Sequence, residues 1–137
     1  MQSWQWLSGL AVVVAIGAAP TPAPESPVGS WRLISAKENG KEVAVPAGTT
    51  VLKHVTPTDF IFVYYDTSGH ITVAGGGHYK LSGTRYEESV EYGLGEGMQP
   101  YIGKTQVFTL RLEGGRWYQS GTETTGAVTE EVWQRER

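Results

Sequence analysis

The stretch Gly29-Ser30-Trp31-Arg32-Leu33-Ile34 constrains the fold of this chain more than any other, because it places a glycine and a tryptophan at the start of a strand-like run. A matching segment lies near the far end of the chain, Glu131-Val132-Trp133-Gln134-Arg135. In a closed β-barrel the first and last strands are neighbours, so the planar guanidinium of Arg135 can stack on the indole of Trp31. We therefore expect Gly29, Trp31 and Arg135 to close one end of a barrel.

The residues between these two segments predict an all-β domain. Short runs of alternating apolar and polar residues are separated by Gly, Asn, Asp and Pro, and no run has helical periodicity. The expected strands cover about residues 29–36, 51–55, 60–65, 70–81, 84–92, 105–113, 116–123 and 127–135. Asn39-Gly40 marks a tight hairpin, because both residue types accept positive φ angles. About eight strands joined by short loops are typical of an up-and-down antiparallel barrel.

The first 24 residues have a different character. They carry no charged side chain, and an apolar run over residues 6–19 is followed by Pro20-Thr21-Pro22-Ala23-Pro24. The run is short for a membrane span and has the length of a signal-peptide core. We expect residues 1–24 to be an export signal and Pro/Ala-rich leader, cleaved between Ala18 and Glu25, and residues 25–137 to form the barrel domain. The protein is then exported, either periplasmic or secreted. An uncleaved leader that anchors the protein in a membrane is the alternative, and we expect no other membrane contact.

Composition argues against several classes of function. The chain has no cysteine, which excludes disulfides, thiolate metal sites and a lipoprotein anchor. The net charge is −3 and the basic residues are scattered, so nucleic acid is not an expected partner. His54, His70 and His78 have no metal-ligand spacing, and no Gly-x-Ser-x-Gly nucleophile motif occurs. We expect no metal, no cofactor and no catalytic residue.

Three consecutive glycines, Gly75-Gly76-Gly77, interrupt the strand expected over residues 70–81. Glycine weakens a strand interior, so this run needs a physical reason. One reason is a bulge or bend where the barrel sheet folds over itself. The other is close approach of a ligand to bare backbone. Farther along, the longest loop, residues 93–103, is expected to be a mobile flap over the barrel mouth.

The strand expected over residues 84–92 has two faces of different chemistry. Tyr86, Glu88, Val90 and Tyr92 share one face, and three charged residues and a serine share the other. Water is the better environment for the charged face, so the face with Tyr86 and Glu88 is expected to line the lumen.

A carboxylate inside a barrel needs a partner, since burying it unpaired is costly. For Glu88 we expect that partner to be Arg111 or a tyrosine hydroxyl. An inward Arg135 also brings Glu131 inward, because the two residues lie on the same face of the last strand. Three interpretations of these carboxylates remain open: a structural or solubilising role, recognition of a ligand head group, or paired acid–base catalysis.

The expected strands carry many aromatic residues for one small core. An eight-stranded barrel can be filled by such side chains or can hold one small ligand, and both outcomes use the same residues. The candidate ligand-binding residues are Phe62, Tyr64, Tyr79, Tyr86, Glu88, Phe108, Arg111 and Trp117.

An ordered set of motifs carries a resemblance to a known family. The set is Gly29-Ser30-Trp31-Arg32-Leu33, Ala74-Gly75-Gly76-Gly77-His78-Tyr79, Tyr86-Glu87-Glu88, Gly103-Lys104-Thr105, Trp117-Tyr118-Gln119-Ser120-Gly121 and Glu130-Glu131-Val132-Trp133-Gln134-Arg135. With these motifs the chain resembles the lipocalins and their relatives in the calycin superfamily. It is more closely similar to small exported bacterial lipocalin-like proteins of unassigned function. The chain departs from lipocalins by its short length and by having no evident helix after the last strand, so a lipocalin ligand preference is not carried over.

The function that we expect from the sequence is non-catalytic binding of a small, mostly apolar or amphipathic molecule in the lumen. Two alternatives remain open. One is a barrel enzyme that carries out an isomerisation or cyclisation with a lumen tyrosine or glutamate as acid or base. The other is a structural or inhibitory module with a filled core.

Overall fold

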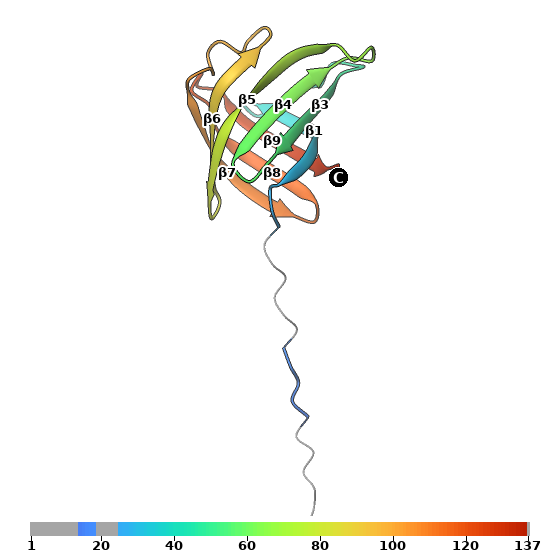
Figure 1. Ribbon diagram of the computed structural model, residues 1–137, viewed down its shortest axis with the longest axis vertical. Coiled ribbons are helices and arrows are strands. Elements are labelled where there is room, and N and C mark those ends of the chain that lie inside the picture. The colour runs from blue at the N-terminus through green and yellow to red at the C-terminus, as the bar shows by residue number, and fades with distance from the viewer. Residues whose placement is uncertain (1–13, 19–24, 137) are drawn as a thin grey trace, which may run out of the picture.

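The computed structural model describes residues 14–18 and 25–136, and the chain from Gly29 onward forms a single β-barrel (Figure 1). The leader predicted over residues 1–24, with its cleavage region, lies mostly outside the described residues and stays a prediction. Within the described residues, no helix has the length and apolar character needed to cross a membrane.

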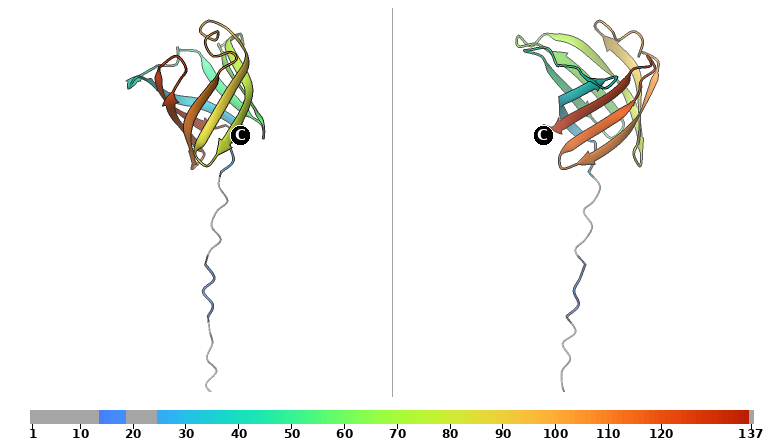
Figure 2. Two further views of the ribbon diagram at one scale, coloured as in Figure 1. Left: turned by 90° about the vertical axis from the view of Figure 1, so that its left-hand side faces the viewer. Right: turned by 180° about the vertical axis from the view of Figure 1, so that it is seen from behind.

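The described part of the chain contains nine antiparallel strands. They are β1 Gly29–Glu38, β2 Lys41–Glu42, β3 Thr50–Val55, β4 Asp59–Tyr65, β5 Ile71–Ser82, β6 Arg85–Leu94, β7 Thr105–Glu113, β8 Arg116–Thr122 and β9 Val128–Arg135. Each strand from β3 to β8 pairs with the next strand in the chain, and β1 pairs with both β3 and β9. The barrel is therefore closed by eight strands (Figure 2), which confirms the predicted fold.

The short strand β2 pairs with β1 alone and extends the hairpin at Asn39-Gly40. Asn39 has a φ of 51° and Gly40 a φ of 79°. Positive φ at both central positions matches the twist of the flanking strands, so the predicted tight hairpin is confirmed.

The glycine run lies inside β5, which continues without a break from Ile71 to Ser82. The predicted interruption is thus wrong, but the bulge is present, since the pairing of β5 with β6 shifts between Gly76 and Gly77. A Cβ at Gly77 would lie 1.9 Å from the carbonyl oxygen of Ser89. Close approach of the neighbouring strand is therefore what requires glycine at this position.

The same bulge changes which side chains of β6 face the lumen. Tyr86, Glu88 and Val90 are buried as predicted. The pairing then skips Glu91, so Tyr92 turns outward and is 51% exposed, which corrects its predicted inward position. One extra residue in a strand reverses the alternation of every side chain that follows it.

The base of the barrel is closed around Trp31, which is fully buried. The guanidinium carbon of Arg135 lies 4.2 Å from the centroid of the Trp31 ring, and the rings of Trp31 and Trp117 meet edge to face at 5.3 Å. Arg135 also donates hydrogen bonds to the carbonyl oxygens of Ser26 and Val28. Gly29 starts β1 with a φ of 138°, a conformation that favours glycine.

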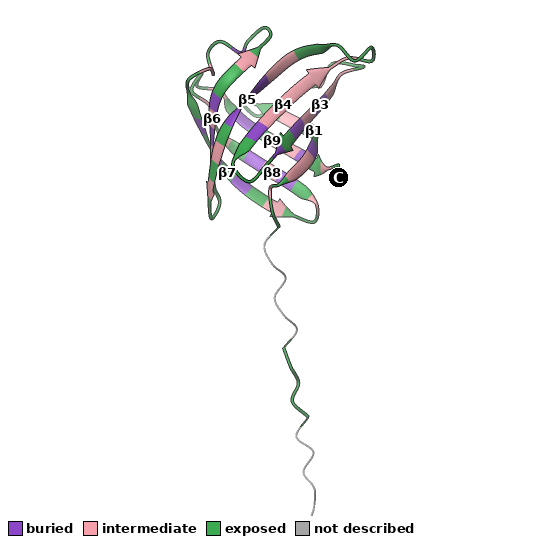
Figure 3. Ribbon diagram, in the orientation of Figure 1, coloured by how far each residue is buried: buried purple, intermediate pink, exposed green. Residues whose placement is uncertain are grey.

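Large side chains fill the lumen near this base. The largest fully buried side chains are Trp31, Trp117, Tyr86, Phe60 and Val51. Figure 3 shows buried and exposed positions alternating along the strands, as expected when one face of each strand lines a packed interior. The filled base leaves space only toward the opposite end, which we call the mouth.

Replacing the tryptophan at the base tests its structural role. Trp31→Ala should lower the free energy of unfolding by about 3–5 kcal/mol, because it removes a buried indole together with its contacts to Trp117 and Arg135. Ile34→Ala, at a position 42% exposed on the same strand, should change it by about 0.5 kcal/mol or less. Urea denaturation measures both. Equal midpoints for the two variants would contradict closure of the base by Trp31.

Candidate functional site

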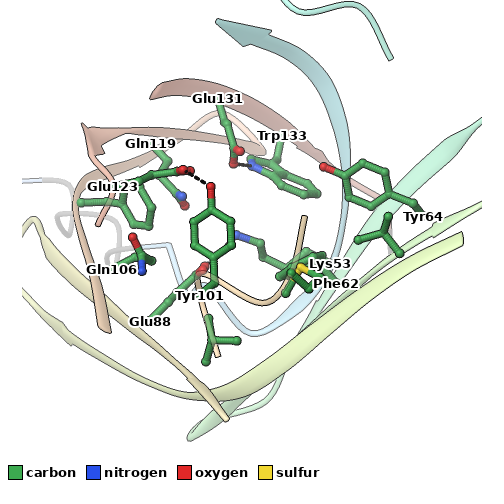
Figure 4. Close-up of a pocket in the computed structure, with 14 residues that line it drawn as sticks. Lys53, Phe62, Tyr64, Glu88, Tyr101, Gln106, Gln119, Glu123, Glu131 and Trp133 are labelled. Carbon is green, nitrogen blue, oxygen red and sulfur yellow. Dashed lines mark hydrogen bonds and ion pairs between the residues drawn. The ribbon is translucent and has the colours of Figure 1, made fainter. Parts of the chain in front are cut away.

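A cavity of about 180 Å³ occupies the lumen between the packed base and the mouth (Figure 4). Its walls combine apolar and aromatic side chains with ionisable and amide groups. The lining residues are Lys53, Phe62, Tyr64, Val73, Glu88, Val90, Met98, Tyr101, Gln106, Phe108, Gln119, Glu123, Glu131 and Trp133. Most β-strands of the barrel contribute to it, so the cavity exists only because the sheet closes.

The deepest charged group is the ammonium of Lys53, a residue that is 2% exposed. Its Nζ donates a hydrogen bond of 2.8 Å to Glu88 Oε1. The same nitrogen lies 4.6 Å from the ring centroid of Trp133 and 4.8 Å from that of Trp117. A carboxylate and two indole faces therefore replace the water that this cation loses on burial.

Glu88 accepts a second hydrogen bond at the same oxygen, from the hydroxyl of Tyr86 at 2.7 Å. Burial raises the pKa of Tyr86 well above its ordinary value, and the neighbouring Glu88 charge raises it further. The Tyr86 phenol thus stays neutral and acts as a donor. The predicted partner of Glu88 is partly right, since a tyrosine hydroxyl binds it, but Lys53 takes the place expected for an arginine.

A second carboxylate, Glu131, lines the cavity from β9. Its Oε2 accepts a hydrogen bond of 2.9 Å from Trp133 Nε1. Burial raises the pKa of Glu131, the charge of Glu88 raises it further, and Lys53 acts in the opposite direction. Glu131 shares the face of Trp133 and Arg135, which confirms the orientation inferred from strand alternation.

The loop over residues 95–104 lies at the mouth, where the sequence predicted a flap. Met98 is 5% exposed and reaches into the cavity. The hydroxyl of Tyr101 donates to Glu123 Oε2 at 2.6 Å, and Gly103 N donates to the carbonyl of Val90 at 2.8 Å. Burial and the bond to Glu123 raise the pKa of Tyr101 to about 12, so its hydroxyl remains a donor. The loop is held to the barrel by these bonds.

Two glutamine side chains complete the polar wall. Gln106 exchanges two hydrogen bonds with Thr124, whose backbone N–H and hydroxyl both take part. Gln119 accepts a bond of 2.9 Å from Trp117 Nε1. Across the cavity, burial raises the pKa of Tyr64 to about 12, so this phenol is also neutral.

The structure places the eight predicted ligand-binding residues in four different surroundings. Phe62, Tyr64, Glu88 and Phe108 line the cavity. Tyr86 and Trp117 lie beneath it, in the packed base. Tyr79 packs on Tyr86 with ring centroids 5.7 Å apart and donates to the carbonyl of Thr56 at 2.7 Å.

Arg111 does not belong to the lumen, and its prediction as a lumen residue is wrong. It is exposed on the outer face of β7, forms an ion pair with Glu113 and lies over the ring of Tyr118. Leu110 is buried in the core, and strand alternation then turns Arg111 outward.

Sequence reasoning missed Lys53, Gln106, Gln119 and Glu123 as lining residues. A signal for Lys53 was present, because it lies two residues from both Val51 and Val55, which face inward. Gln106 is related in the same way to Phe108 on β7, and Gln119 to Trp117 on β8. Glu123 follows the end of β8, and no strand pattern marked it. In residues 14–18 and 25–136, no group of three or more histidine or acidic side chains is placed to hold a metal ion.

Breaking the buried ion pair tests its energetic role. Lys53→Met and Glu88→Gln should each lower the free energy of unfolding by about 3–5 kcal/mol, because each leaves one buried charge without its partner. The double variant should lose less than the sum of the two single losses. Urea denaturation of the four proteins completes a double-mutant cycle.

Glu87→Gln is the matched control for this cycle, since Glu87 pairs with the exposed Arg85 on the outside of β6 and should contribute about 0.5 kcal/mol or less. Fully additive losses for Lys53→Met and Glu88→Gln would contradict a direct interaction between the two buried groups.

Glu131→Gln should change the pH dependence of stability. Because the pKa of Glu131 is raised above its ordinary value of 4.5, the folded protein keeps this proton where the unfolded chain has released it. Glu131 therefore lowers stability progressively as the pH rises from about 4.5 through the raised pKa. The variant lacks this loss, so its stability relative to wild type should increase as the pH rises from about 4.5 through the raised pKa of Glu131. Urea denaturation across that range measures the difference, with the outward-facing Glu130→Gln as control. A constant difference would contradict the raised pKa.

Several solved structures resemble this barrel, among them two from Bacteroides species. An uncharacterized protein from Bacteroides eggerthii superposes with a TM-score of 0.57 at 15% sequence identity, covering 80% of this chain and 98% of that one. A lipocalin-like protein from Bacteroides uniformis superposes with a TM-score of 0.55 at 18% identity, covering 80% of this chain and 97% of that one. Comparison with protein-family models and with curated proteins gives no match. The chain therefore has a lipocalin-like β-barrel fold, the class that its sequence predicted.

Proposed function

We propose that this protein binds a small amphipathic molecule in the lumen cavity without transforming it. The observation that carries the proposal is a cavity that is apolar along part of its wall and charged along the rest. Small-molecule sites in proteins commonly combine an apolar lining with a few polar groups that orient the ligand.

The volume of the cavity limits the size of the ligand. At about 180 Å³ it is smaller than the cavities that hold drug-sized ligands, and a cavity of about 150 Å³ can hold benzene. The proposed ligand is therefore a molecule with about one ring or a short aliphatic chain. Phe62, Phe108 and Val73 offer the apolar surface for that body.

The polar wall calls for a polar group on the same ligand. Glu88, Glu123 and Glu131 border the cavity together with Lys53. A wholly apolar ligand would displace water from these groups and offer no hydrogen bond in return, which is unfavourable. Of the mostly apolar or amphipathic ligands expected from the sequence, these groups favour an amphipathic one.

An acid–base enzyme is the second candidate, and Glu131 is the residue that favours it. A cavity-facing carboxyl whose pKa is raised by burial is suited to accept or donate a proton. Recovery of a bound molecule in chemically unaltered form after prolonged incubation favours binding, and its conversion into an isomer favours the enzyme. The cavity of about 180 Å³ argues against the third hypothesis, a structural or inhibitory module with a filled core.

Native mass spectrometry of the protein recovered from the envelope or medium of the producing cell tests the proposed function. We expect a mass increment from one small bound molecule per chain. Val73→Phe places a ring in the cavity and should abolish this increment. Val107→Phe, on the outer face of β7, should retain it. Ligand-free protein in every preparation, or equal retention by both variants, would contradict binding in the lumen.

A further inference from the structure

We infer that the ligand of this cavity is a small organic cation, such as a primary amine with one aromatic ring or a short aliphatic chain. This inference rests on the proposed function and specifies the charge of the molecule that is bound. Four features of the described residues support it: the balance of charge, the free carboxylate oxygens, the aromatic wall and the environment of Lys53.

The charged groups that border the cavity do not balance. Three carboxylates line it, Glu88, Glu123 and Glu131, and Lys53 is the one basic residue among the lining residues. Lys53 is paired with Glu88 at 2.8 Å. Glu123 and Glu131 instead accept neutral donors, the hydroxyl of Tyr101 and the indole N–H of Trp133. A ligand with a positive charge would offset the remaining negative charge, and an anionic ligand would increase it.

Each of the three carboxylates keeps one oxygen without a donor among the described residues. Glu88 receives both of its bonds at Oε1, while Glu123 and Glu131 each receive one at Oε2. Glu88 is only 6% exposed, so its free oxygen is part of a side chain that is more than nine-tenths buried.

The free oxygens belong to residues that line the cavity. Every fully enclosed side-chain oxygen or nitrogen in residues 14–18 and 25–136 has a hydrogen-bond partner. An oxygen without one must therefore touch accessible space, and all three of these residues line the cavity. Figure 4 shows the three side chains reaching it from different parts of the wall, around Tyr101 and Lys53. Carboxylate oxygens only accept, and an ammonium group only donates, so the two are chemically complementary.

The aromatic wall favours the same class of ligand. Phe62, Tyr64, Phe108 and Trp133 border the cavity, and aromatic faces attract cations as well as apolar groups. The barrel already holds one ammonium group in this way, since Lys53 is bound by a carboxylate and lies over two indole rings. A ligand amine in the cavity would find the same two kinds of partner, carboxylate oxygens and aromatic faces.

Three probes of nearly equal size and different charge test the inference: 2-phenylethylamine, 2-phenylethanol and phenylacetate. Calorimetric titration at neutral pH should give the order of affinity amine, then alcohol, then carboxylate. Loss of one charge-assisted hydrogen bond commonly costs about tenfold or more in affinity. We therefore expect Glu131→Gln to weaken the amine about tenfold and to change the alcohol about twofold or less. The outward-facing Glu130→Gln should leave all three affinities unchanged.

The outcomes separate this inference from the proposed function. If the alcohol or the carboxylate binds as tightly as the amine, the inferred charge is wrong and binding in the lumen stands. If no probe binds, the inference fails, and the proposed function is decided separately by native mass spectrometry of the recovered protein. If the amine binds equally well to wild type, Glu131→Gln and the cavity-filling Val73→Phe, it is held by the negatively charged surface, and the inference is overturned. Amine binding that is lost in Val73→Phe and weakened in Glu131→Gln supports it.

Discussion

The antiparallel pairing of β1 with β9 is the interaction on which the rest of this structure depends. It removes the free edges that an open sheet of these strands would expose. It also brings Arg135 over the indole of Trp31, although the two residues lie near opposite ends of the domain's sequence. The guanidinium stacks on the ring and also donates hydrogen bonds to the backbone carbonyls of Ser26 and Val28. These hydrogen bonds hold the segment before β1 against Arg135 at the base of the barrel.

Closure gives the lumen two regions with different chemistry. Near the base, Trp31, Trp117 and Tyr86 meet edge to face and leave no space for a ligand. Toward the mouth, Lys53 and Glu88 interrupt the apolar packing, and the cavity begins beside them. The change from aromatic core to charged wall takes place along single strands, since Trp117 and Gln119 are separated by one residue on β8. The alternation of a strand thus places a structural residue and a cavity residue on the same inward face.

The buried pair of Lys53 and Glu88 bears directly on the proposed function. A buried ion pair is often no more stabilising than apolar side chains of similar volume, because removing two charges from water is costly. Here the cost is offset by a hydrogen bond, the Tyr86 hydroxyl and two indole faces. Such an arrangement is expected to add little stability beyond that of a packed apolar core. It does supply the polar contacts that a binding cavity needs. The two further carboxylates beside it are consistent with the same interpretation.

The sequence by itself determined the fold class, the strand order, the hairpin at Asn39-Gly40 and the inward face of β6 as far as Val90. These features follow from local alternation and turn chemistry, which a linear pattern records directly.

Tertiary structure decided the outward position of Tyr92, because the bulge beside Gly77 depends on the approach of a neighbouring strand. It also decided which partner Glu88 has. Arg111 and Lys53 are both basic residues on strands, but Arg111 faces outward from β7 and Lys53 faces inward from β3. Only the register of the closed barrel puts Lys53 within 2.8 Å of that carboxylate. The cavity has the same origin, since its walls come from strands that lie far apart in the sequence and meet only when the sheet closes.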